Sequence, residues 1–171
     1  KDQPEGSHTR LGWGQQFANL QAPLGYDKFG YAWRSRKGTV FHDSNGARFS
    51  DGFKVGDVLG ILIHLPEEDN TISRLPSTFK DKPLVKFRSH LYYEDKDDIP
   101  EALRKLTPLP GSKIVFFKNG EEQGVAFKDI YNGIYHPSIS LYKNITVAVN
   151  FGPKFKHPPQ NYDFKAMNEK C

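Results

Sequence analysis

The chain has 171 residues, of which 24 are Lys or Arg and 20 are Asp or Glu, so its formal net charge is +4. This length fits one domain, and the single cysteine, Cys171, excludes an internal disulfide and a cysteine-based metal site. No apolar run approaches the roughly 20 residues of a membrane helix, so we expect a soluble intracellular protein without membrane contact.

The excess positive charge lies in the first third of the chain. Between Arg10 and Lys54 there are seven basic and three acidic residues, whereas the other 17 basic and 17 acidic residues cancel. A local surplus favours a local anionic partner over a charge-coated protein that wraps duplex DNA. Nucleic acid is therefore the secondary hypothesis.

The composition favours many short strands over long helices, because aromatic residues make up 13% of the chain and turn-forming residues recur along it. The segment from Tyr26 to Arg34 alternates between apolar and polar side chains. With period-two spacing, one face is buried and the other lies in solvent. We predict that the buried face carries Phe29, Tyr31 and Trp33, and the solvent face Tyr26, Lys28 and Arg34.

Other elements follow from apolar runs and turn signals. The run at residues 57–65 is apolar on both faces, which predicts a central strand covered on each side. Asn-Gly pairs predict tight turns at residues 45–46 and 119–120. Further strands are predicted at residues 10–13, 39–42, 84–93, 114–127, 137–141 and 146–151, one short helix at residues 100–106, and flexible ends at residues 1–9 and 160–171.

Arginines and aromatics gather between Arg10 and Lys37 with little carboxylate nearby, a mixture that can recognise an extended anionic partner. From the residues alone, Arg10 and Arg34 could equally be solvated strand residues, because exposed arginines are common. Large aromatics are usually buried, so we assign Trp13 and Trp33 to the core.

No catalytic constellation competes with this stretch. His42, Asp43 and Ser44 are residue types of a triad, but sequence neighbours point apart and cannot form the relay. The histidines have no zinc-site spacing, and the acidic runs at residues 67–69 and 95–98 lack the ligand pattern of a calcium loop. We expect a protein that is not an enzyme, with no catalytic residue, metal or cofactor.

Several motifs resemble the SPRY domain, a bent antiparallel β-sandwich that presents loops for protein binding. They are RLGWG, GDVLG, IVFFKNGEEQGVAF, HPSISLY and VAVNFGP. Residues 19–38, NLQAPLGYDKFGYAWRSRKG, and 151–159, FGPKFKHPP, more closely resemble the family of the trithorax-group protein absent, small or homeotic discs two. The resemblance implies an all-β fold, with a single SPRY domain over residues 1–171 that begins inside the fold and lacks its first strands.

The same resemblance implies a nuclear, non-catalytic core subunit of MLL/COMPASS-type complexes, which methylate lysine four of the third core histone. In that family the SPRY domain holds an Asp/Glu-rich segment of the retinoblastoma-binding WD-repeat subunit, and the pair activates the SET-domain methyltransferase. The family's basic pocket maps onto Arg10, Pro23, Tyr26 and Arg34, with Lys28, Arg36 and Lys37 as additional basic contacts. A phosphorylated partner residue should bind more tightly, because it adds charge and acceptors.

Two alternatives remain open. One is a generic SPRY adaptor, such as the substrate receptor of a ubiquitin ligase, that binds an unrelated peptide through its loops. The other is weak contact with DNA or the nucleosome through Arg34, Arg36, Lys37 and Lys54. The stretch GYDKFGYAWRSRK favours the methyltransferase subunit over both.

Overall fold

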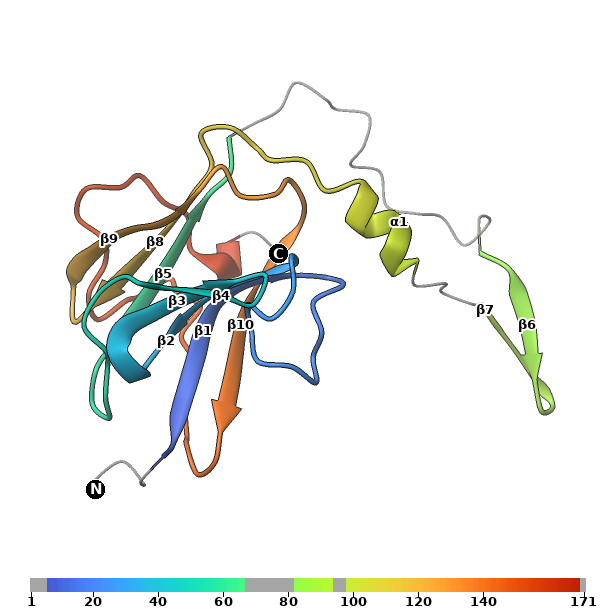
Figure 1. The fold of residues 1–171 in the computed structure, drawn as a ribbon, viewed down its shortest axis with the longest axis horizontal. Coiled ribbons are helices and arrows are strands. Elements are labelled where there is room, and N and C mark those ends of the chain that lie inside the picture. Colours follow the sequence, from blue (N-terminus) through green and yellow to red (C-terminus); the bar gives the residue numbers. More distant parts are fainter. Residues whose placement is uncertain (1–5, 67–81, 94–97, 170–171) are drawn as a thin grey trace.

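The computed structural model describes residues 6–66, 82–93 and 98–169, and antiparallel strands dominate it (Figure 1). One sheet has five strands in the order β10-β1-β2-β3-β4. Its strands are β1 (His8–Gln15), β2 (Gly30–Arg34), β3 (Thr39–His42), β4 (Asn45–Arg48) and β10 (Tyr135–Tyr142). The other sheet, ordered β5-β8-β9, consists of β5 (Leu59–His64), β8 (Lys113–Lys118) and β9 (Glu121–Lys128).

The two sheets pack around one aromatic core. Trp33 of β2 is fully buried and stacks on Phe116 of β8, with ring centroids 5.3 Å apart. The buried cluster also draws on both sheets and on the segments between them, through Leu11, Trp13, Tyr31, Val40, Phe53, Ile114, Ile130 and Tyr135. The predicted all-β sandwich is confirmed, and both tryptophans belong to its core as expected.

Strands β1 and β2 show why the sandwich has two different faces. Leu11 and Trp13 pair with Trp33 and Tyr31 on the core side, while the residues between them form an outer face of small or basic side chains. The predicted burial of Phe29, Tyr31 and Trp33 is confirmed. However, β2 begins only at Gly30, because residues 26–29 form turns that carry the chain over the sheet.

The prediction of a central strand at residues 57–65 was wrong. Within the described residues β5 lies at the edge of its sheet and is only half-buried, whereas β8 lies between β5 and β9. Ile114, Val115 and Phe116 of β8 are fully buried. Both segments are apolar on two faces, so hydropathy could not tell the middle strand from its neighbour.

Of the two Asn-Gly turns, only one is where it was predicted. Asn119 and Gly120 connect β8 and β9 with φ of 54° and 89°, as a type I′ turn requires. At the other site the turn residues are Asp43 and Ser44, with φ of 49° and 60°, and β4 already begins at Asn45. Aspartate tolerates the left-handed region almost as well as asparagine does, so the pattern misplaced this turn by two residues.

The ends of the chain also differ from expectation. Residues 146–151 form no strand, and Val149 is 58% exposed there. The ends predicted to be flexible contain packed residues, because Thr9 is buried in β1 and Ala166 is buried in the final segment. Tyr162 also donates a hydrogen bond to Glu122 on β9 at 3.0 Å.

A third element stands apart from the sandwich (Figure 1). Strands β6 (Leu84–Phe87) and β7 (His90–Tyr93) form an exposed hairpin within residues 84–93, where the sequence predicted strand. Helix α1 (Ile99–Arg104) confirms the predicted short helix, and Asp98 caps it by accepting a hydrogen bond from the Glu101 nitrogen. The described residues also include the short 3-10 turns η1 (Arg36–Gly38) and η4 (Met167–Glu169). None of the described helices has the length and apolar character needed to cross a membrane.

The core contact between the sheets predicts a large stability effect. Replacing Trp33 with alanine removes a fully buried ring that stacks on Phe116, so Trp33→Ala should lower the free energy of unfolding by about 3–5 kcal/mol. Urea denaturation would measure this change. Leu20→Ala is the matched control, because Leu20 is 96% exposed and its loss should leave stability nearly unchanged. Equal effects of the two variants would contradict the described core.

His42 predicts a pH effect on stability. Its ring stacks on Tyr31 at 4.0 Å, and burial lowers its pKa below the ordinary value of 6.5 although its Nδ1 is bonded to the Gly30 carbonyl. Just below pH 6.5 the unfolded chain therefore binds more protons at this residue than the folded chain, and stability falls as the pH decreases. Urea titrations at pH 7 and pH 5 should show a smaller loss in His42→Gln than in the parent chain. Parallel losses in both proteins would contradict this assignment.

Candidate functional site

Two arginines lie side by side on the outer face of the five-stranded sheet. Arg10 on β1 is the direct cross-strand partner of Arg34 on β2. Both guanidinium groups cover the ring of Phe41, which projects from β3, with the Arg10 Cζ 3.8 Å and the Arg34 Cζ 4.8 Å from the ring centroid. The aromatic face attracts each cation and so holds together two groups that repel each other.

The charge on this pair is only partly shielded by solvent. Burial lowers the pKa of Arg10 below its ordinary value, and the positive charge of Arg34 lowers it further. An arginine with this surrounding still stays protonated. A bound anion that contacts both groups would therefore relieve their repulsion as well as form charge-assisted hydrogen bonds.

The arginines keep hydrogen-bond donors available. Arg10 Nη1 donates to the Leu24 carbonyl at 3.0 Å. Arg34 Nε donates to the Arg36 carbonyl at 3.2 Å, and its Nη2 donates to Thr39 Oγ1 at 3.4 Å. Each guanidinium has five N–H donors, so these bonds help to fix its position and leave other donors for further hydrogen bonds. The two guanidinium groups are therefore held in place, but their hydrogen-bonding capacity is not fully used.

Asp27, the acid nearest to Arg34 in the sequence, is already engaged by the backbone. Asp27 accepts hydrogen bonds from the Phe29 nitrogen at 2.9 Å and from the Asn19 nitrogen at 2.7 Å. Within the described ranges no carboxylate forms an ion pair with Arg10 or Arg34. The carboxylates of the described residues therefore leave both guanidinium groups without an ion-pair partner.

The loop at residues 16–29 folds over the outer face beside the arginines, because the sheet has almost no side chains there. A methyl group on Gly30 would lie 2.9 Å from the Gly25 nitrogen and 3.1 Å from Leu24 Cδ1. Gly25 has a φ of 82° and packs against the backbone of Phe41. Glycine at both positions allows the close approach.

This loop presents the other two predicted contact residues. Pro23 accepts a hydrogen bond from the Tyr26 nitrogen at 3.0 Å, and the Tyr26 carbonyl accepts one from Ser44 Oγ at 2.6 Å. The first bond lies within the loop, and the second fastens the loop to the turn between β3 and β4. Tyr26 is 54% exposed, so its ring and hydroxyl are accessible to a partner.

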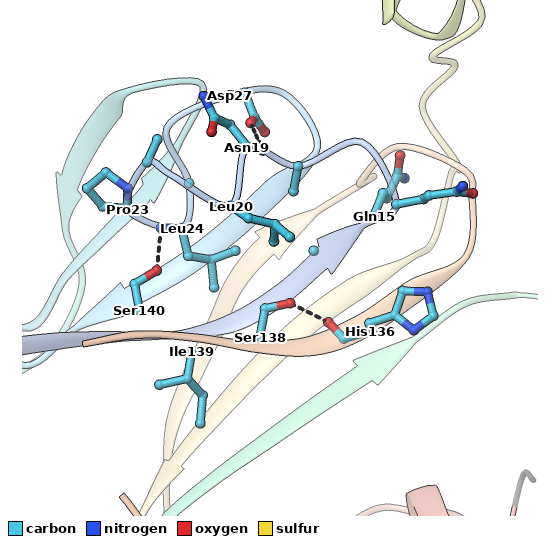
Figure 2. A pocket seen from close by; sticks show the side chains of 15 residues that line it. Gln15, Asn19, Leu20, Pro23, Leu24, Asp27, His136, Ser138, Ile139 and Ser140 are labelled. Carbon is cyan, nitrogen blue, oxygen red and sulfur yellow. Dashed lines mark hydrogen bonds between the residues drawn. The ribbon is translucent and has the colours of Figure 1, made fainter. Parts of the chain in front are cut away.

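A shallow pocket of about 220 Å³ adjoins this loop (Figure 2). Pro23 and Leu24 form one wall, and Ser138 and Ser140 of β10 form another. Ser140 is the cross-strand partner of Arg10 and accepts a hydrogen bond from the Leu24 nitrogen at 2.8 Å, drawn as a dashed line in Figure 2. The pocket therefore lies next to the arginine pair and could receive a neighbouring side chain of the same ligand.

The structure separates the additional basic residues from the central four. Arg36 and Lys37 are exposed in η1, and Arg36 joins the site only through its carbonyl. Lys28 is exposed and close enough to His42 for its charge to lower the pKa of that ring. Among the cations of the described residues, Arg10 and Arg34 are the two that lie over the Phe41 ring. None of these three side chains is held on the Phe41 ring with the arginine pair.

Sequence reasoning missed Phe41 and the Leu24 carbonyl. Phe41 lies on the outer face because it pairs with Ala32 across β2 and β3, and that register is not visible in a single strand. Alternation within residues 39–42 places Phe41 on the same face as Thr39, but it does not tell which face of the sheet that is. Only the pairing of three strands shows that this face also carries both arginines.

The residue types of a triad do not meet. His42 is bonded to the Gly30 carbonyl, whereas Ser44 Oγ donates to the Tyr26 carbonyl. Over residues 6–66, 82–93 and 98–169, no three His, Cys, Asp or Glu side chains gather in a way that could hold a metal ion.

Comparison with known proteins finds close relatives over nearly the whole chain. A Drosophila melanogaster protein named Set1/Ash2 histone methyltransferase complex subunit ASH2 is 61% identical over 166 residues, covering 97% of this chain and 30% of that protein. Its Caenorhabditis elegans namesake, ash-2, is 43% identical and covers 93% of this chain and 30% of the relative. The Schizosaccharomyces pombe Set1 complex component ash2 is 30% identical, covering 91% and 28%.

The chain thus spans less than a third of the length of these curated relatives. No family model matches it.

The close approach of the loop at Gly30 gives a testable prediction. Gly30→Ala should push Leu24 and Gly25 away from the sheet and destabilise the protein by about 1–3 kcal/mol. Backbone NMR should show chemical-shift changes at residues 23–26, while β8 on the other sheet serves as the internal control. Unchanged shifts in the loop together with unchanged stability would show that the loop does not rest on this glycine.

Proposed function

Because the chain belongs to the ASH2 family, we propose that it is a non-catalytic protein-binding domain of a histone methyltransferase complex. It matches one segment of the longer family members. Its task is to hold an acidic segment of a partner protein on the outer face of the five-stranded sheet. The observation that carries this proposal is the pair of arginines on Phe41, which within the described residues meets no carboxylate. Relatives named as complex subunits support a role in assembly.

Four residues form the proposed contact. Arg10 and Arg34 supply charged donors, Tyr26 supplies an exposed ring with a hydroxyl, and Pro23 supplies a rigid wall without a donor. Partial burial strengthens the charged bonds, because each is worth about 1.5–3 kcal/mol when desolvated and much less in open solvent. An acidic segment with a phosphorylated residue should bind more tightly still.

We further propose the identity of the partner. The acidic segment would be the Asp/Glu-rich part of the retinoblastoma-binding WD-repeat subunit, as the SPRY-like motifs imply. Together the two would support a SET-domain enzyme in methylating lysine four of the third core histone, which places the protein in the nucleus. The names of the three relatives favour a methyltransferase subunit over a ubiquitin-ligase adaptor, because each name refers to a Set1 complex.

Loss of either arginine should abolish most of the binding. Arg10→Ala and Arg34→Ala should each weaken the affinity for an Asp/Glu-rich peptide at least about tenfold, because each removes charged hydrogen bonds worth about 1.5–3 kcal/mol. Calorimetric titration measures the affinity, and a thermal scan should show little change in the melting midpoint.

The matched control is Arg104→Ala, which removes an exposed arginine from α1. It should leave the affinity unchanged. A neutral peptide of the same length and a short DNA duplex complete the comparison, and neither should compete with the acidic peptide. Unchanged affinity in both arginine variants, or stronger binding to the duplex with steep salt dependence, would refute the proposed function.

A further inference from the structure

Arg48 lies in the same cross-strand row as the arginine pair. Arg10 is opposite Arg34, and Thr39 accepts a hydrogen bond from Arg34 across β2 and β3. Thr39 is in turn the cross-strand partner of Arg48 on β4. Directly paired residues of antiparallel strands project from the same face, so all three arginines belong to the outer face.

A second contact fixes the orientation of β4. Gly46 pairs with Phe41, and a methyl group on Gly46 would lie 2.8 Å from Cε1 of that ring. The outward face of Gly46 is therefore the face that carries the Phe41 ring. Because Arg48 is two residues further along the same strand, it shares this face. Arg48 is exposed and has no ion-pair partner in the part of the chain that the structure describes.

The spacing of the row matches an extended peptide. Neighbouring strands are about 4.8 Å apart, so β4 lies about 10 Å from β2 and about 14 Å from β1. An extended chain advances about 3.4 Å per residue, which means that about five residues span the row from β1 to β4. Side chains on one face of that peptide would recur about every 6.8 Å, close enough for flexible arginines to meet them.

Along the row from β10 to β4, the arginines lie on β1, β2 and β4, and β10 contributes an uncharged residue. Beyond Arg10 the next position is Ser140 on β10, whose hydroxyl oxygen accepts a hydrogen bond from the Leu24 nitrogen of the loop at residues 16–29. At the other end, β4 is followed by Ser50, whose nitrogen donates a hydrogen bond to the carbonyl of Gly38 in η1 at 3.2 Å. Arg48 at the end of β4 therefore lies near η1. Positive charge therefore extends from Arg10 toward β4 and not toward β10.

We propose that Arg48 is a third cationic contact and that the acidic segment crosses the strands of the sheet, from β1 to β4. This inference rests on the proposed function and adds to it the direction of the ligand. A segment that ran parallel to β1 and β2 would contact the arginine pair without reaching Arg48. A ligand that crosses the strands needs an acidic block of about five residues to reach from Arg10 to Arg48. A ligand that runs parallel to β1 and β2 gains no affinity from acidic residues beyond those that contact Arg10 and Arg34.

The test uses two peptides of equal length. One has a block of five acidic residues, and in the other only two adjacent residues are acidic and the rest of the block is glutamine. Arg48→Ala should weaken the five-acid peptide about two- to fivefold, as expected for an exposed ion pair, and leave the two-acid peptide unchanged. Arg48→Lys should restore most of the loss, and Arg104→Ala should have no effect on either peptide.

The outcomes separate this inference from the proposed function. If Arg10→Ala and Arg34→Ala weaken the five-acid peptide but Arg48→Ala does not, the site is real and the ligand does not cross the sheet. Equal weakening of both peptides by Arg48→Ala would also overturn the inference, since it would reflect only the total charge of the protein. If no arginine substitution has an effect, the proposed function itself is wrong.

Discussion

The pairing register of β1 with β2 is the constraint on which the rest of the structure depends. It places Trp13 and Tyr31 on the core side, and it sets Arg10 opposite Arg34 on the other side. Two like charges in that position repel each other and are held by the ring of Phe41. Burial of the aromatic residues stabilises the register, so the hydrophobic core maintains a surface arrangement that would be unfavourable by itself.

The same register explains how the loop at residues 16–29 comes to lie beside the arginines. Between the core-facing aromatics of β1 and β2, the outer face carries glycine and alanine, and this flat area receives Leu24. Arg10 then donates to the Leu24 carbonyl and joins the loop to the strand. The arginine pair and the packed loop thus occupy one surface of the sheet.

Residues 26–34 show how much a single segment can indicate. Its alternation correctly predicted the burial of Phe29, Tyr31 and Trp33, because one chain carries the full period-two pattern. The role of β5 could not be predicted in that way, since its apolar pattern resembles that of the buried strand β8. Strand order depends on contacts between segments far apart in the chain, and no local pattern contains that information.

By itself the sequence determined the all-β class, the aromatic core and the local surplus of basic residues, because these follow from composition and from periodicity within short segments. It also identified the stretch that contains Arg10 and Arg34. Only the tertiary structure decided that the two arginines share the Phe41 ring, that Asp27 is occupied by backbone donors, and that Arg48 stands in the same row. The reason is that electrostatic contacts act across strands, and strand register is set by packing of the whole sandwich.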